Sequence, residues 1–196
     1  TGIRMTKWVL RLIVANFFLF LLAPPGSQLF GTLAFVPALT LVRPWTLFTY
    51  MFLHAGWAHL IFNMLGLFFF GPSLEARLGS RDFLLLYFLS GLGGAVLSFV
   101  FQPMASVVGA SGAVFGVLLG FAYFWPRQPI YIWGILPIQA RVLVLILAVM
   151  SVYSGFVGAG GNIAHFAHLG GFVAGWAFLS WRQRRVRKLR QIRTGP

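Results

Sequence analysis

Long apolar segments separated by short polar ones recur along the chain, and this pattern constrains its fold more than any other feature. Charged residues make up 9% of the 196 residues, whereas a soluble domain carries about a quarter. A helix that crosses a bilayer needs about 20 mostly apolar residues, and each segment is close to that length. We therefore predict an all-α, polytopic membrane protein with six spanning helices, at residues 8–23, 58–73, 83–101, 111–125, 140–157 and 163–181.

The first of these segments has an alternative interpretation as a signal peptide. Lys7 and Arg11 precede or begin an apolar run, which is also typical of a secretory leader. No small-x-small cleavage site follows the run, and Pro24 and Pro25 come instead. We therefore favour a spanning helix.

The basic residues predict how the chain is oriented in the membrane. The formal net charge is +13, and the Lys and Arg residues lie between the apolar segments or in the C-terminal part. By the positive-inside rule, both termini, the turn from Glu75 to Asp82 and the loop between Arg127 and Arg141 are cytoplasmic, and only Arg43 lies outside. We interpret residues 182–196 as a basic cytoplasmic tail that contacts anionic lipid, following a membrane domain at residues 1–181.

This distribution of charge argues against nucleic acid as a partner. A nucleic-acid-binding protein gathers its basic residues on one solvated face, whereas here they are divided among separate loops. A tail that binds RNA or protein remains the alternative to a lipid-contacting tail. The chain has no cysteine, which excludes disulfides and thiolate metal sites.

The segment from Pro24 to Trp57 is too long for a tight turn and too apolar for a solvated loop. It contains several prolines and aromatic residues together with Arg43, which we interpret as a loop anchor or headgroup contact. Irregular backbone persists at membrane depth only where it packs on protein or lines water. We therefore predict a structured first loop, embedded at the outer interface and packed on the helices.

Four polar residues inside the apolar segments indicate a functional site. Ionisable groups within a bilayer are costly and commonly mark function. His59 and Asn63 are four residues apart and share one helix face. The predicted topology places them at a similar depth, in the outer half of the membrane, to Ser111 and His168, which come from two other helices.

Glycine spacing suggests how these helices meet. Small residues at every fourth position let helix backbones approach closely. Such stripes occur in the fourth and sixth segments, at Gly112, Gly116 and Gly120 and at Gly171 and Gly175. If the stripes face each other, Ser111 and His168 come within the ~2.6–3.2 Å that a base needs to activate a serine. Packing without chemistry is the alternative interpretation of the stripes.

A third catalytic residue is not expected behind the histidine. The two acidic residues of the chain, Glu75 and Asp82, are predicted on the cytoplasmic side, a bilayer's depth from Ser111. If this topology holds, a Ser-His-Asp triad is excluded and any serine chemistry would use a dyad. Asn63, His59 and the backbone N–H of Ser111 are then the available donors for a developing oxyanion.

Several linked motifs resemble those of the rhomboid intramembrane serine proteases. HLIFN (59–63), GASG (109–112) and AHLGGFVAG (167–175) match the H-x-x-x-N, G-x-S-G and A-H-x-x-G-x-x-x-G patterns of that family. RPWTLFTYMFLH (43–54) is similar to the end of the family's first loop, with its Trp-Arg region rearranged. GPSLEARLGS (71–80) is similar to the segment that follows the second helix. A lone G-x-S-G is a weak signal, but the ordered set on alternate helices is specific.

The resemblance covers about residues 8–181 and implies the basic six-helix form of the family. It implies an endopeptidase that cuts transmembrane protein substrates entering from the lipid, with the fifth helix as the movable wall. It implies Ser111 as nucleophile and His168 as general base and acid. Phe115 stands where some members have a tyrosine that stacks on the histidine. The other implied site residues are Asn63, His59 and the Ser111 amide for the oxyanion, and His54, Gly109, Gly112 and Phe115 lining the site.

No cofactor or metal is expected, and the sequence leaves two alternative functions. Four histidines near one face would suit a metal transporter, but no acid accompanies them and no H-E-x-x-H pattern occurs. A non-catalytic rhomboid-like binder of membrane clients is the second, and retention of Ser111 and His168 argues against it. We interpret His165 as a packed or interface residue. We expect a bacterial or archaeal plasma membrane, with an organelle membrane as the alternative; the oligomeric state does not follow from the sequence.

Overall fold

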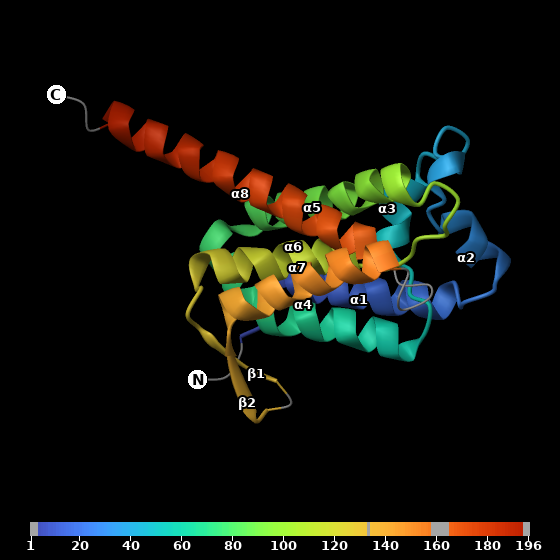
Figure 1. Cartoon of the computed structure of the whole chain (residues 1–196), viewed down its shortest axis with the longest axis horizontal. Coiled ribbons are helices and arrows are strands. Elements are labelled where there is room, and N and C mark those ends of the chain that lie inside the picture. Colours follow the sequence, from blue (N-terminus) through green and yellow to red (C-terminus); the bar gives the residue numbers. More distant parts are fainter. Residues whose placement is uncertain (1–3, 133, 158–164, 194–196) are drawn as a thin grey trace.

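The long helices of the chain form one bundle (Figure 1). The computed structural model describes residues 4–132, 134–157 and 165–193. Figure 1 shows the β-hairpin at one end of the bundle, the end where α1 begins and toward which α8 runs, and helix α2 at the other. We call these the hairpin end and the Ser111 end. The bundle helices are α1 (Lys7–Leu22), α4 (Trp57–Leu78), α5 (Ser80–Phe101), α6 (Ser111–Phe124), α7 (Ala140–Val157) and α8 (His165–Arg193).

Three of these helices, α4, α5 and α7, are long and apolar enough to cross a membrane, and α6 is a shorter apolar helix. Most expected boundaries lie within a few residues of helix ends in the structure, but those at the junction of α4 with α5 and at the end of α8 differ. The expected start of the last segment, residue 163, lies outside the described residues. Helix α4 continues to Leu78, not residue 73, and α5 begins at Ser80, because Gly79 alone makes the turn between them at φ +82°. Helix α8 does not end at residue 181 but runs to Arg193, through Arg, Lys and Gln residues that favour helix.

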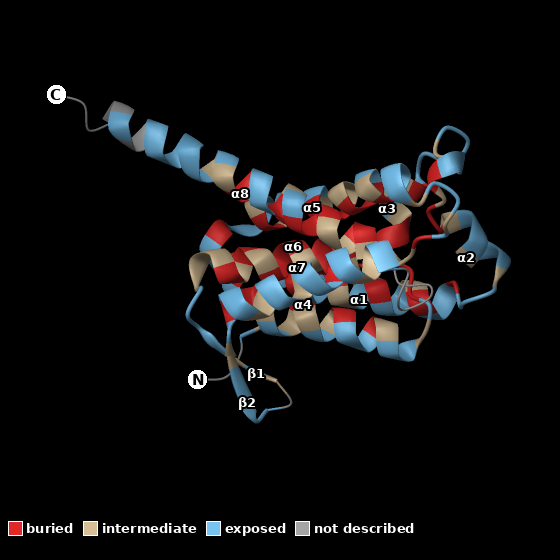
Figure 2. Ribbon diagram, in the orientation of Figure 1, coloured by how far each residue is buried: buried red, intermediate tan, exposed pale blue. Residues whose placement is uncertain are grey.

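Helix α6 is the most enclosed element of the bundle. Figure 2 shows it largely buried, whereas the outer face of α7 and the C-terminal part of α8 are exposed. Small buried residues such as Gly112, Ala113 and Gly116 let α6 lie close to its neighbours α5 and α8. The apolar core therefore surrounds the helix that begins with Ser111.

The segment between α1 and α4 is structured and packs against the bundle. It contains α2 (Gln28–Leu33), α3 (Thr46–Thr49) and two short 3₁₀ turns, η1 (Pro37–Leu39) and η2 (Tyr50–Phe52). Phe35 exchanges backbone hydrogen bonds with Val107, at N···O distances of 3.1 and 2.8 Å. The buried Tyr50 hydroxyl donates to the carbonyl of Gly91 at 2.7 Å. These contacts fix the loop to the segment that leads into Ser111.

Arg43 lies within this loop and bonds to the loop itself. Its Nη1 donates to the carbonyl of Gly31 at 3.1 Å, and the indole N–H of Trp45 donates to the carbonyl of Thr32 at 3.1 Å. Both donors therefore hold α2 against the start of α3. This arrangement agrees with Arg43 acting as a loop anchor.

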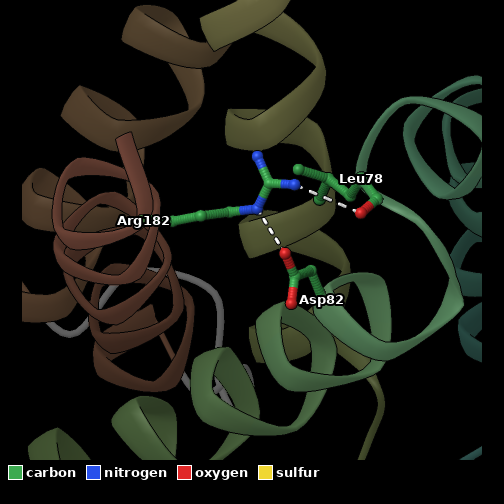
Figure 3. Close-up of polar contacts among 3 residues, drawn as sticks. All are labelled: Leu78, Asp82 and Arg182. Atoms are coloured by element: carbon green, nitrogen blue, oxygen red, sulfur yellow. Dashed lines mark hydrogen bonds and ion pairs between the residues drawn. The ribbon is translucent and has the colours of Figure 1, made fainter. Parts of the chain in front are cut away.

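The two acidic side chains both lie at the hairpin end. The buried Glu75 carboxylate accepts the backbone N–H groups of Trp8 and Val9 at 3.2 Å and the hydroxyl of Ser80 at 2.7 Å. It thereby caps the positive end of the α1 dipole. Asp82 pairs with Arg182 of α8, whose Nη2 donates to the carbonyl of Leu78 at 3.2 Å (Figure 3).

The loop between Arg127 and Arg141, for which no strand was predicted, contains an antiparallel hairpin. Strand β1 (Pro129–Ile132) pairs with β2 (Leu136–Gln139), and Ile130 lies opposite Ile138. Gly134 has φ +73°, a backbone conformation that favours glycine. The hairpin joins α6 directly to α7.

Candidate active site

Ser111 and His168 meet at one end of the bundle. Ser111 is the first residue of α6, and His168 lies in the first turn of α8. The Nε2 atom of His168 is 2.9 Å from the Oγ atom of Ser111, within hydrogen-bonding distance. Two residues 57 positions apart in the chain are thus placed side by side.

Close packing of α6 on α8 explains this proximity. A Cβ atom built on Gly171 would lie 2.7 Å from the carbonyl carbon of Gly112. One built on Gly175 would lie 3.2 Å from the Cα of Gly116. The two glycine stripes therefore face each other at these four residues, as close helix approach requires.

Gly120 does not belong to this contact. A Cβ there would meet Leu74 of α4 at 2.8 Å and Leu86 of α5 at 3.0 Å. Gly120 therefore packs against α4 and α5, and the two glycine stripes do not face each other at this residue. Because an α-helix has 3.6 residues per turn, residues spaced four apart shift steadily in angular position around it, and the last glycine of the stripe faces other helices.

A second glycine contact was missed by the sequence reasoning. A Cβ on Gly93 of α5 would overlap the carbonyl oxygen of Gly170 of α8, and one on Gly94 would lie 2.8 Å from the carbonyl oxygen of Ala167. The signal was present in the run GLGG at residues 91–94. This contact fixes the N-terminal turns of α8, which carry His168, against α5.

The imidazole of His168 is held against an aromatic ring. The Phe115 ring stacks on it, with centroids 4.2 Å apart and planes inclined by 22°. Phe115 in turn contacts Phe172 at a centroid distance of 4.9 Å. Phenylalanine here supplies a ring face, although it lacks the hydroxyl of a tyrosine. The His165 ring lies edge-on to His168 at 6.0 Å.

Gly109 separates His59 from Ser111. Its φ is +122°, and its backbone N–H donates to the carbonyl of Tyr50 at 2.9 Å. A Cβ at this position would lie 2.6 Å from the Nε2 atom of His59 and 3.7 Å from the Oγ atom of Ser111. A side chain at this position would therefore collide with the imidazole of His59, so glycine allows the ring to lie this close to the segment that precedes Ser111.

The hydrogen bonds around His59 define its tautomer. The backbone N–H of Ala55 donates to Nδ1 of His59 at 3.3 Å, so in the neutral ring Nε2 carries the proton. This N–H edge faces the space beside Gly109. The ring of the buried His54 lies edge-on to His59 at 5.0 Å, and Asn63 donates from Nδ2 to the carbonyl of His59 at 2.8 Å.

The polar site has no acidic component. Both carboxylates of the chain make their contacts at the hairpin end, whereas Ser111 begins α6 at the opposite end. Among the described residues, no group of three or more His, Asp or Glu residues is placed to hold a metal ion. The arrangement suits proton transfer between one hydroxyl and one imidazole.

The fold and site define a class of protein: a helical membrane bundle with a Ser–His pair at one end. Residues 42–184 match the family model of the Rhomboid domain. Over 157 residues the chain is 34% identical to Rhomboid-like protease 3 of Toxoplasma gondii, covering 80% of this chain and 58% of that protein. The chain belongs to the rhomboid family and is an integral, multi-pass membrane protein.

Relatives named as rhomboid proteases also occur in a bacterium. The chain is 38% identical over 133 residues to Rhomboid protease GluP of Bacillus subtilis (strain 168), covering 67% of this chain and 25% of that protein. It is 36% identical over 146 residues to Putative rhomboid protease YdcA of the same organism, covering 72% of this chain and 70% of that protein. The chain thus spans between a quarter and about 70% of these relatives.

Proposed function

We propose that this protein is an intramembrane serine endopeptidase that hydrolyses peptide bonds in or near transmembrane helices of other membrane proteins. The observation that carries the proposal is the 2.9 Å contact between Oγ of Ser111 and Nε2 of His168 within an apolar bundle. Membership of a family whose relatives are named proteases supports it. Ser111 is the nucleophile and His168 the general base and acid.

His168 acts through the nitrogen that faces the serine. When Nε2 is the acceptor, Nδ1 carries the proton of the neutral ring. Nε2 takes the Ser111 proton as Oγ attacks the substrate carbonyl, and the imidazolium then protonates the leaving amine. A water molecule, deprotonated by the same imidazole, releases the acyl group. Phe115 and the α5–α8 contact hold the ring in place, a task that an acid performs in a triad.

The oxyanion forms beside Gly109 in this proposal. The Nε2–H of His59 faces that space, and the N–H of Ser111 is among the first groups of α6, which have no partner within the helix. One Nδ2–H of Asn63 is used by the carbonyl of His59, so its second N–H is the one to turn toward an oxyanion. Donors fixed before reaction stabilise the developing charge without reorganisation.

The proposal includes the way in which the helices cross the membrane. The basic residues favour six spans, with cytoplasmic termini and Ser111 toward the outer side. Helix α1 and the first part of α8 supply the two spans beyond α4, α5, α6 and α7. The first loop is embedded at the outer interface in this arrangement. Only 11% of α7 is buried, which favours α7 as the wall that moves when a substrate helix enters from the lipid.

Active-site labelling tests the proposal directly. Purified protein in detergent is treated with a fluorophosphonate, and the adduct is located by mass spectrometry. We expect one adduct, on Ser111, and none in Ser111→Ala or His168→Ala. In parallel, a model transmembrane substrate with small residues near its outer end is incubated with each variant. We expect cleavage by the unmodified protein alone.

The alternatives give other results in the same experiment. Cleavage that survives Ser111→Ala would contradict the serine mechanism, and its loss on chelation would point to metal chemistry. A folded protein that takes no label and cleaves nothing, yet retains the substrate on a column, would be a non-catalytic binder of membrane clients. Neither alternative explains why the two side chains are in contact.

Gly109→Ala is expected to lower kcat about 10²–10³-fold, the effect of losing oxyanion donors. The new Cβ would lie 2.6 Å from His59 and would push the imidazole from its place. Gly134→Ala is the matched control, because Gly134 also has a positive φ, +73°, but nothing within 4 Å of a Cβ. Initial rates and thermal unfolding are measured for both. Equal loss of activity in the two variants would show that backbone strain, not the site, is responsible.

A further inference from the structure

A groove of about 440 Å³ between α6, α7 and α8 has no role in the proposed chemistry. That volume is within the range of sites that hold small molecules. Figure 1 shows the three helices as neighbours. The groove is lined by Leu119, Ala122 and Tyr123 of α6, by Arg141, Val144, Leu145 and Ala148 of α7, and by Phe172, Val173 and Trp176 of α8.

The polar lining residues gather at one end of the groove. Arg141 is the second residue of α7, and Tyr123 is the last but one of α6, so both lie next to the hairpin. The lining from Val144 to Ala148 follows α7 away from the hairpin and is apolar. A phospholipid has the same order, a charged headgroup followed by hydrocarbon chains.

The groove opens toward the surroundings of the bundle. Leu145, Val173 and Trp176 line it and are more than half exposed. Only 11% of the residues of α7 are buried, compared with 39% and 44% in the most apolar 18-residue stretches of α4 and α5, and Figure 2 shows its pale outer face. In a bilayer no water fills such a hollow, and an empty one forfeits dispersion contacts. The acyl chains of the surrounding lipids are the groups available to fill the groove.

Among the described residues, Arg141 supplies a cation with no carboxylate partner. The two acidic residues are engaged elsewhere, Glu75 with α1 and Asp82 with Arg182. Gln139 of β2 accepts from Nε of Arg141 at 2.9 Å, and the backbone N–H of Arg141 donates to Pro126 at 3.1 Å. The hairpin therefore positions the guanidinium, whose terminal N–H groups match the oxygens of a phosphodiester.

We propose that this groove binds one anionic phospholipid, with its phosphate on Arg141 and an acyl chain between α7 and α8. The lipid contacts all three helices and so sets how α7 lies against α6 and α8. The site is separate from Ser111, and its test does not depend on whether the protein is a protease.

Native mass spectrometry of the whole chain tests this site. The protein is reconstituted into vesicles of equimolar phosphatidylglycerol and phosphatidylcholine, extracted in mild detergent, and its retained lipid is identified. We expect one retained lipid per chain, with phosphatidylglycerol favoured about tenfold, equivalent to about 1.4 kcal/mol. Arg141→Gln is expected to remove the preference, and Ala148→Trp, which fills the groove, to remove the retained lipid.

Two matched variants serve as controls. Val149→Trp places the same indole on the next residue of α7, which is exposed and does not line the groove. Arg187→Gln removes an equal charge from the exposed part of α8. Both are expected to retain lipid as the unmodified protein does.

Several results would overturn the proposal. One is lipid retention that is unchanged in a monodisperse Ala148→Trp protein. Another is that Arg187→Gln also loses the preference for phosphatidylglycerol. A third is a second protein chain bound in place of lipid. If Ala148→Trp does not fold, the Arg141→Gln comparison still decides the headgroup contact.

Discussion

Replacing Ser111 by alanine is expected to lower kcat for cleavage of a transmembrane substrate by about 10⁴-fold or more, and His168→Ala by a similar factor. The double variant is expected to lose no more than either single variant. The reason is that the 2.9 Å contact makes the two groups one unit, because the serine is a weak nucleophile without its base. The rate acceleration that remains in these variants comes from substrate binding and the oxyanion donors.

Rates of all three variants with one substrate check this expectation. Ser151→Ala is the matched control, because Ser151 is also buried but its hydroxyl donates to Leu147 within its own helix at 2.8 Å. Its rate should stay close to that of the unmodified protein. Single-variant losses that multiply in the double variant would show that Ser111 and His168 act independently, which the proposed mechanism does not allow.

The sequence predicted the meeting of α6 and α8 because its signal is geometric. Four-residue glycine spacing brings two backbones together, and the alternation of helices puts Ser111 and His168 at the same end. The helix that each glycine faces was harder to predict from the sequence. Gly120 continues the stripe in sequence but faces Leu74 and Leu86 in space. An apolar helix gives no polar face by which its rotation can be judged.

The hairpin and the full length of α8 could not be predicted from the hydropathy pattern alone, because other factors determine them. Residues 129–132 and 136–139 are too short to span, and they pair where the ends of α6 and α7 hold them together. The charges after residue 181 indicate that the chain leaves the membrane, but they say nothing against a continuing helix. Hydropathy marks where a membrane ends, whereas helix propensity and the absence of Gly and Pro decide where a helix ends.

Gly171→Ala is expected to destabilise the bundle by about 3 kcal/mol, the upper end of the usual cost of overpacking. The added Cβ would overlap the backbone of Gly112, which lies in the enclosed α6. Backbone cannot move aside as a flexible side chain can, so α8 must separate from α6. That separation would also pull His168 from Ser111, so activity should fall together with stability.

A graded series of glycines separates this clash from other effects of alanine. Gly175→Ala would place its Cβ 3.1 Å from Ser90 and 3.2 Å from Gly116, so a loss of about 1 kcal/mol is expected, the lower end of overpacking costs. Gly31 lies inside α2 with nothing within 4 Å, so Gly31→Ala should gain up to about 1 kcal/mol from helix propensity. Unfolding by SDS in mixed micelles orders the three variants. Because propensity favours alanine at all of them, a Gly171→Ala protein as stable as Gly31→Ala would mean that α6 and α8 do not approach as closely as the structure shows.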